Sequence, residues 1–139
     1  MKHLRTTLIV VGIFQIFFGL LFLLAPGPAA SMFGLEPDAP AWANWLFAMM
    51  AARFLGYGYG MFVAARDPLG RVAWIDTMIA IQAIDWLATL GYLISGDLTL
   101  AQVTTAAVAP PLFIAALLAF HPRRAGVAAA RAVPLTQAR

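Results

Sequence analysis

Two charged side chains and a glutamine lie deep within long apolar runs of this sequence. Arg53, Asp85 and Gln15 each stand eight or nine residues from one end of their run, which at about 1.5 Å per helical residue places all three at a similar depth. A central Arg or Asp costs about 2.5 to 3.5 kcal/mol in a bilayer, so the two charges are expected to pair. The carboxylate could instead bind a proton, an ion or a polar ligand, as carboxylates do in transport proteins.

Further polar groups are expected in the same layer. Gln82 precedes Asp85 by three residues and so shares its helical face. The Pro110-Pro111 pair has no amide hydrogens and leaves the carbonyls four residues earlier without helical donors, which a neighbouring threonine could supply. The candidate layer, which is either a structural ion-pair network or a site for a ligand or ion, comprises Gln15, Arg53, Gln82, Asp85, Thr104 and Thr105.

Several kinds of chemistry are disfavoured by what the chain contains. The sequence has no cysteine and only two histidines, so we expect no metal site and no cofactor. A nucleophile with its base, a phosphate loop and a paired-carboxylate site are also missing, and we expect no enzymatic activity. The basic sequence pI of about 10.0 is better explained by membrane topology and anionic lipid than by nucleic acid.

The elements that must position this layer are predicted to be membrane-spanning helices. Of the 139 residues, 63% are hydrophobic and 11% charged, and the mean hydropathy is +0.85. The four apolar stretches each have the roughly 20 residues that a helix needs to cross a bilayer. We therefore predict an all-α integral membrane four-helix bundle within one domain, residues 1–122, with spans at about 4–25, 45–65, 72–94 and 98–120. A signal peptide is disfavoured, because the first apolar run is long and three more follow it.

The distribution of basic residues predicts an orientation. Lys and Arg fall before the first span, between the second and third, and after the fourth, whereas the other two loops contain only acidic charges. By the positive-inside rule both termini face the cytoplasm, and the composition suggests a bacterial inner membrane. Residues 123–139 are predicted to be a basic cytoplasmic tail, either helical or disordered, and residues 29–35 a small interfacial helix.

Small residues mark the expected packing surfaces. Gly12 and Gly19 flank Gln15 and would allow close helix approach. The second span carries a ridge of small residues spaced by four, which would pack within the chain or against another copy. This small-residue ridge comprises Ala48, Ala52, Gly56, Gly60 and Ala64. Asp76 lies on the other side of its helix from Asp85 and is expected to pair with Arg71, Arg123 or Arg124.

Loose motifs along most of the chain resemble small bacterial four-helix membrane proteins of the DoxX-like type. The motifs are the run 12–26, Met32-Phe33-Gly34, Ala52-Arg53-Phe54-Leu55-Gly56 and Ala64-Ala65-Arg66-Asp67-Pro68. The resemblance implies a four-helix bundle and, in some cases, association with a larger membrane oxidoreductase system.

Three functions agree with these patterns. The first is an accessory or assembly subunit that packs with itself or with a larger membrane complex through the small-residue ridge. The second is a small homo-oligomeric transporter or channel that uses the polar layer. The third is a binder of a lipid, quinone or pigment in a cleft lined by aromatic residues such as Phe14, Phe18 and Tyr57. Of these, the sequence favours the accessory subunit.

Overall fold

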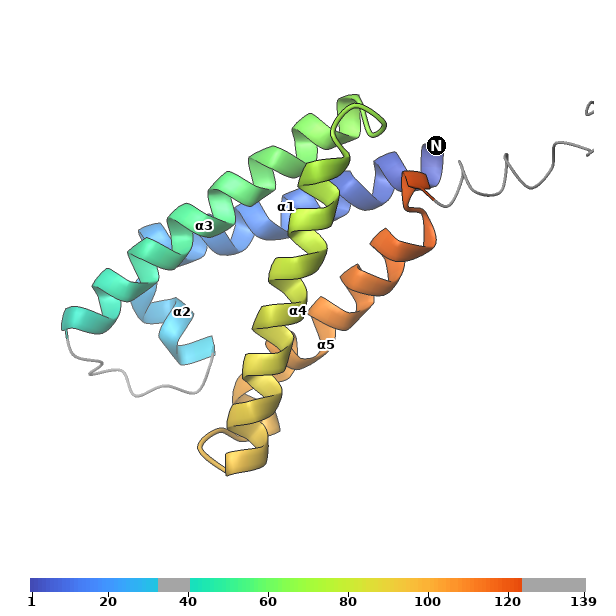
Figure 1. Cartoon of the computed structure of the whole chain (residues 1–139). Coiled ribbons are helices and arrows are strands. Elements are labelled where there is room, and N and C mark those ends of the chain that lie inside the picture. The colour runs from blue at the N-terminus through green and yellow to red at the C-terminus, as the bar shows by residue number, and fades with distance from the viewer. Residues whose placement is uncertain (33–40, 124–139) are drawn as a thin grey trace, which may run out of the picture.

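The computed structural model describes residues 1–32 and 41–123, and in this part of the chain the fold is all-α. It contains five helices, arranged as Figure 1 shows. They are α1 (Lys2–Leu24), α2 (Pro26–Met32), α3 (Ala41–Arg66), α4 (Val72–Ser95) and α5 (Leu100–Ala119). Helices α1, α3, α4 and α5 are long and apolar enough to cross a membrane. The prediction of an all-α protein with four such helices is therefore confirmed.

The two short turns have clear local causes. Helix α4 ends at Ser95 and is capped by Gly96, whose φ of 81° lies in the left-handed region that glycine adopts without strain. Helix α5 then begins with a capping box, in which the Thr99 amide donates to the Gln102 Oε1 at 2.9 Å. In the turn between α3 and α4, the Gly70 amide donates to the Asp67 Oδ1 at 3.0 Å. These turns make α3, α4 and α5 successive antiparallel elements.

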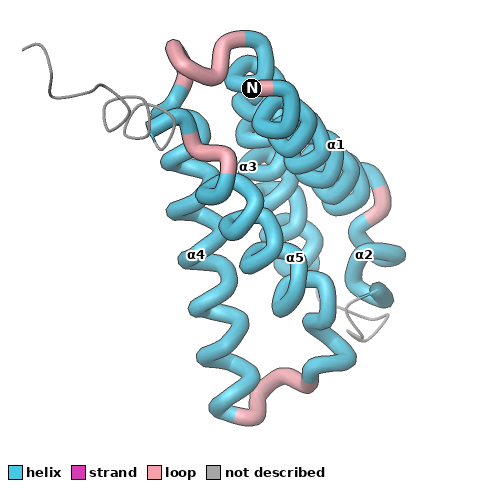
Figure 2. The backbone as a smooth tube through the Cα atoms, turned by 90° about the vertical axis from the view of Figure 1, so that its right-hand side faces the viewer, coloured by secondary structure: helices cyan, strands magenta, loops and turns pink. Residues whose placement is uncertain are grey.

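The four long helices form two pairs. Helix α1 runs alongside α3 for most of its length, and α4 runs alongside α5. The pairs lie close together at the end where α1 begins and α5 ends, here called the terminal end, and they diverge toward the opposite end (Figure 1). Figure 2 shows the same two pairs from a perpendicular direction. The divergence leaves space between the pairs that side chains of all four helices border.

Glycines explain why α1 and α3 approach so closely. A Cβ atom added to Gly58 would lie 2.8 Å from the Ile16 Cδ1 and 3.1 Å from the Gly12 carbonyl oxygen. A Cβ atom on Gly19 would lie 2.8 Å from the Leu55 side chain. Gly12 and Gly19 thus lie at a close helix contact, where Gly12 faces Gly58 and Gly19 faces Leu55. Gly58 lies outside the small-residue ridge.

The buried core lies at the terminal end. One cluster of buried side chains joins all four long helices there, and it comprises Leu4, Leu8, Val11, Met61, Ala64, Ala65, Ile75, Met78 and Leu117. A second cluster joins α1, α2 and α3 through Phe18, Phe22, Ala29 and Ala51. Few side chains of α4 and α5 are buried beyond the first cluster. The two helix pairs are therefore held together mainly at the terminal end.

The outer surface of the bundle is apolar. Large hydrophobic side chains such as Ile13, Phe17, Ile84, Leu87 and Leu112 are each more than half exposed. In water such a surface would be an aggregation hazard, whereas hydrocarbon would solvate it. The long helices have 20 to 26 residues, which at about 1.5 Å per residue gives at least about 30 Å.

Two predictions about segments outside the long helices fall partly on residues that the structure does not describe. The short helix after the first span begins at Pro26 instead of at the predicted residue 29, because Pro26 and Pro28 suit the first turn of a helix, where an amide hydrogen is not needed. Residues 33–35 of the predicted interfacial helix lie outside the described residues. The predicted basic tail, apart from Arg123, also lies outside them.

Candidate functional site

Arg53 on α3 and Asp85 on α4 form an ion pair that joins the two helix pairs. The Arg53 Nη2 donates to Oδ1 and to Oδ2 of Asp85, each at 2.9 Å. The side chains are 43% and 32% exposed, so the pair is only partly covered by the rest of the chain. The remaining N–H groups of Arg53 have no acceptor among the described residues. The pair therefore has unused donors in a largely apolar setting.

A cavity of about 320 Å³ lies beside this ion pair, between the two helix pairs. One wall is apolar and is contributed by α1 and α3. It comprises Phe14, Phe18, Phe22, Phe47, Met50 and Phe54. The other wall is polar and is contributed largely by α4 and α5 together with the ion pair. It comprises Gln15, Arg53, Gln82, Asp85, Thr89 and Thr105, together with the small residues Ala88, Ala106, Ala109 and Pro110. The cavity is therefore amphipathic.

The aromatic wall is rigidly built. The rings of Phe22 and Phe47 stack with centroids 5.5 Å apart and an interplanar angle of 5°. Phe22 also contacts Phe54 at 5.5 Å, and Phe14 contacts Phe18 at 4.7 Å. Such pairs contribute about 0.5 to 1.5 kcal/mol each beyond their buried area. The rings hold one another in place, so the wall keeps its shape.

Sequence reasoning named only part of this wall. It included Phe14 and Phe18 but missed Phe22, although spacing by four residues places all three on one helical face. It also named Tyr57, whose ring instead packs edge-on against Trp74 with centroids 6.2 Å apart, outside the cavity. The four-residue spacing was a signal that could have identified Phe22. It could not give the rotation of α3, which turns Phe54 rather than Tyr57 into the cavity.

The two glutamines line the cavity without joining the ion pair. Gln15 and Gln82 are each 5% exposed. The Gln15 Nε2 donates to the Met78 Sδ at 3.9 Å, a weak bond, and Gln82 makes no hydrogen bond within residues 1–32 and 41–123. No fully buried side-chain N or O atom in that part of the chain lacks a partner, so the Gln82 amide must open into the cavity. Neither glutamine hydrogen-bonds to Arg53 or Asp85.

The Ala107 carbonyl, which Pro111 leaves without a helical donor, accepts its hydrogen bond from a residue other than the predicted threonine. The indole N–H of Trp86 donates to the Ala107 carbonyl oxygen at 3.0 Å, which ties α4 to α5. The Thr104 hydroxyl donates instead to the Leu100 carbonyl at 2.8 Å and points away from the cavity. Thr105 lines the cavity and makes no hydrogen bond in the described part of the chain. Trp86 was missed from the sequence, because an indole in a membrane helix is usually read as packing or an interfacial anchor.

The small-residue ridge of α3 is divided between two environments. At the terminal end Ala64 is fully buried, and a Cβ atom on Gly60 would collide with the indole of Trp74. Ala48 is half-buried. Farther along, Ala52 and Gly56 are exposed, and a Cβ atom on Gly56 would have nothing within 4 Å. These two residues border an open groove between α3 and α4 that also includes Tyr57, Ala73, Trp74 and Thr77.

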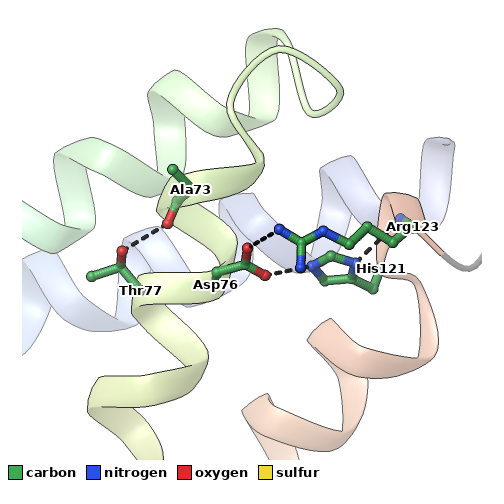
Figure 3. Close-up of polar contacts among 5 residues, drawn as sticks. All are labelled: Ala73, Asp76, Thr77, His121 and Arg123. Carbon is green, nitrogen blue, oxygen red and sulfur yellow. Dashed lines mark hydrogen bonds and ion pairs between the residues drawn. The ribbon is translucent and has the colours of Figure 1, made fainter.

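A second polar cluster lies at the terminal end, where α4 begins and α5 ends (Figure 3). Asp76 contacts the His121 Nε2 through Oδ1 and the Arg123 Nη2 through Oδ2, each at 2.9 Å. The Arg123 amide donates to the His121 Nδ1 at 3.2 Å, which places the imidazole proton on Nε2. Of the expected partners of Asp76, Arg123 is the one in contact, and Arg124 lies outside the described residues. Residues 1–32 and 41–123 contain no group of three potential metal ligands.

Comparison with known proteins adds nothing to this geometry: the chain matches no family model, and neither curated proteins nor solved structures give a significant match. The resemblance to DoxX-like proteins therefore stays a prediction.

Proposed function

We propose that this chain is a multi-pass membrane protein that binds an amphipathic small molecule, drawn from the bilayer, in the cavity between its two helix pairs. The observation that carries the proposal is that one cavity combines an aromatic wall with polar groups of Gln82, Thr105 and Arg53 that have no partner among the described residues. Small-molecule sites are typically concave, mostly apolar and provided with a few polar groups that orient the ligand. This is the third of the functions considered above, and the geometry favours it over the other two.

Membrane insertion is supported by the surface. The apolar side chains that cover the long helices suit hydrocarbon, and the basic residues Lys2, Arg5, Arg66, Arg71 and Arg123 belong to the terminal end. With the positive-inside rule, this distribution supports an orientation with both termini in the cytoplasm. The likeness of the composition to that of GC-rich bacterial proteins supports a bacterial inner membrane as the location.

Ligand binding is supported by polar groups in the cavity that would have no hydrogen-bond partner without a ligand. If hydrocarbon alone filled the cavity, the Gln82 amide and the free N–H groups of Arg53 would have no partner, at a cost of about 1 to 3 kcal/mol for each group. A molecule with a polar end and an apolar body would satisfy these groups and cover the phenylalanine rings. Water alone would satisfy the polar wall and leave the apolar wall exposed to it.

The experiment is native mass spectrometry of the full chain extracted with its surrounding lipids into nanodiscs. We expect a small molecule to be retained by the wild type and by Ala115→Phe, because Ala115 is exposed on α5 and does not line the cavity. In Ala109→Phe, the added ring would occupy the cavity that Ala109 borders, and retention should fall by at least about tenfold. Equal retention by both variants, or none by the wild type, would contradict the proposal.

A second function, that of an accessory subunit, is favoured by the exposed part of the small-residue ridge. Gly56 has open space where its Cβ atom would lie, so Gly56→Leu adds a side chain without an internal clash. Loss of a larger complex in this variant, with an unchanged monomer, would support a partner at the groove between α3 and α4. Gly60→Leu is not equivalent, because it would also disrupt the packing of Trp74.

A further inference from the structure

We infer that the cavity selects an uncharged ligand, whose polar end carries a hydroxyl or carbonyl oxygen, and excludes anionic and cationic amphiphiles. This inference rests on the proposed function and specifies the class of molecule that the site would take. It follows from the pairing of the two charged side chains in the cavity with each other, and from the polar groups there that have no partner among the described residues.

The charges of the cavity cancel each other. Among the described residues, Arg53 and Asp85 are the only ionisable ones that line it, and one Arg53 nitrogen contacts both carboxylate oxygens at 2.9 Å. An anionic head group would therefore have to compete with Asp85 for the guanidinium. A cationic head group would have to compete with Arg53 for a carboxylate whose two oxygens are already engaged. Either exchange leaves one protein charge without its partner in a site with an apolar wall.

The groups that remain are suited to a neutral oxygen. The Gln82 amide offers both a donor and an acceptor, and it is nine-tenths buried with no partner in the described part of the chain. The Thr105 hydroxyl offers the same two functions from the neighbouring helix, and the Gln15 carbonyl oxygen adds an acceptor. The free N–H groups of Arg53 add donors without disturbing its contact with Asp85. A hydroxyl or carbonyl can use these groups while the ion pair stays intact.

The size and position of the cavity limit the rest of the ligand. A volume of about 320 Å³ corresponds to roughly ten water-sized groups at about 30 Å³ each. The apolar wall extends along α1 from Phe14 to Phe22, toward the end at which the helix pairs diverge. The polar end of the ligand would thus lie at the ion pair, with its apolar body against the rings and any longer tail passing between the diverging helices.

The test uses three photoactivatable probes with the same alkyl chain and a primary alcohol, a sulfonate or a trimethylammonium head group. The full chain in phosphatidylcholine nanodiscs is labelled with each probe, and the labelled peptides are identified by mass spectrometry. We expect the alcohol to label cavity residues of α1 and α3 and the two charged probes to label them at least about tenfold less.

Two threonine variants provide a matched control. Thr105→Val removes a hydroxyl from the cavity, whereas Thr104→Val removes one that contacts the Leu100 carbonyl outside it. Because one hydrogen bond contributes a few-fold to tenfold in affinity, Thr105→Val should lower labelling by the alcohol about three- to tenfold and Thr104→Val should not change it.

The outcomes separate the two proposals. Preferential labelling of the cavity by the sulfonate or by the ammonium probe would overturn the inference about charge and leave ligand binding intact. Equal labelling by all three probes, or equal effects of the two threonine variants, would also overturn it. If no probe labels the cavity residues, and native mass spectrometry finds no retained molecule, the proposed function itself fails.

Discussion

Removing both members of the Arg53–Asp85 pair should destabilise the protein about as much as removing either one alone. Asp85→Asn leaves a guanidinium without its counter-charge, and Arg53→Met leaves a carboxylate without its donors. Breaking a buried pair costs about 3 to 5 kcal/mol, and an exposed pair contributes about 0 to 1 kcal/mol. With side chains 43% and 32% exposed, this pair lies between those limits. We expect each single variant to lose about 2 kcal/mol.

The double variant completes the cycle. Because neither charge remains, its loss should be about that of one single variant, which gives a coupling energy of about 2 kcal/mol. The assay is reversible unfolding in mixed micelles, followed by tryptophan fluorescence and circular dichroism. Asp76→Asn with Arg123→Met is the control cycle, since the Arg123 side chain is 72% exposed and its coupling should stay below about 1 kcal/mol. Additive effects of Arg53→Met and Asp85→Asn within about 0.5 kcal/mol would refute the reasoning.

Three further predictions concern packing and topology. Gly58→Val should lower the free energy of unfolding by about 1 to 3 kcal/mol, because the added side chain would collide with α1. Gly56→Val should change it by less than about 1 kcal/mol. Similar losses in the two variants would contradict the assigned interface between α1 and α3. Trp86→Phe should cost about 1 to 2 kcal/mol in the same unfolding assay, because a carbonyl of α5 loses its donor, and an unchanged stability would count against that bond. In this chain without native cysteine, Asp67→Cys and Asp97→Cys should react with impermeant maleimide from opposite sides of sealed vesicles. Reaction from the same side would rule out the predicted orientation.

The helices were predictable because they depend on composition over long windows. Four apolar runs, each long enough to span a bilayer, give four long helices whatever their packing partners. The ends were less certain where local chemistry decides them. Helix α2 begins at Pro26, earlier than expected, because a proline at the first helical position has no amide hydrogen to satisfy.

Counting residues from the ends of the apolar runs predicts that Arg53, Asp85 and Gln15 lie near one another, and Arg53 and Asp85 are in contact. Which groups contact each other could not be predicted, because contact depends on the rotation and separation of the helices. Gln15 lines the same cavity but contacts Met78 rather than the ion pair. Gly58, rather than Gly56, is the close contact to α1.

The cavity itself could not be predicted from periodicity. It exists because the helix pairs are joined at the terminal end and diverge beyond it, a property of the whole arrangement rather than of any one helix. The exposure of α4 side chains illustrates this. Met78 and Gln82 are buried, Asp85 is partly exposed, and Tyr92 at the diverging end is 57% exposed.

The central claim is that an amphipathic molecule occupies this cavity, and nuclear Overhauser contacts to the rings of Phe18 and Phe22 test it most directly. Both rings line the cavity and are at most 7% exposed, so bulk lipid cannot reach them freely. In nanodiscs of deuterated lipid, with only the phenylalanine rings of the protein protonated, a retained ligand should give cross-peaks from its alkyl protons to these rings. Cross-peaks to water alone at the rings would contradict the account.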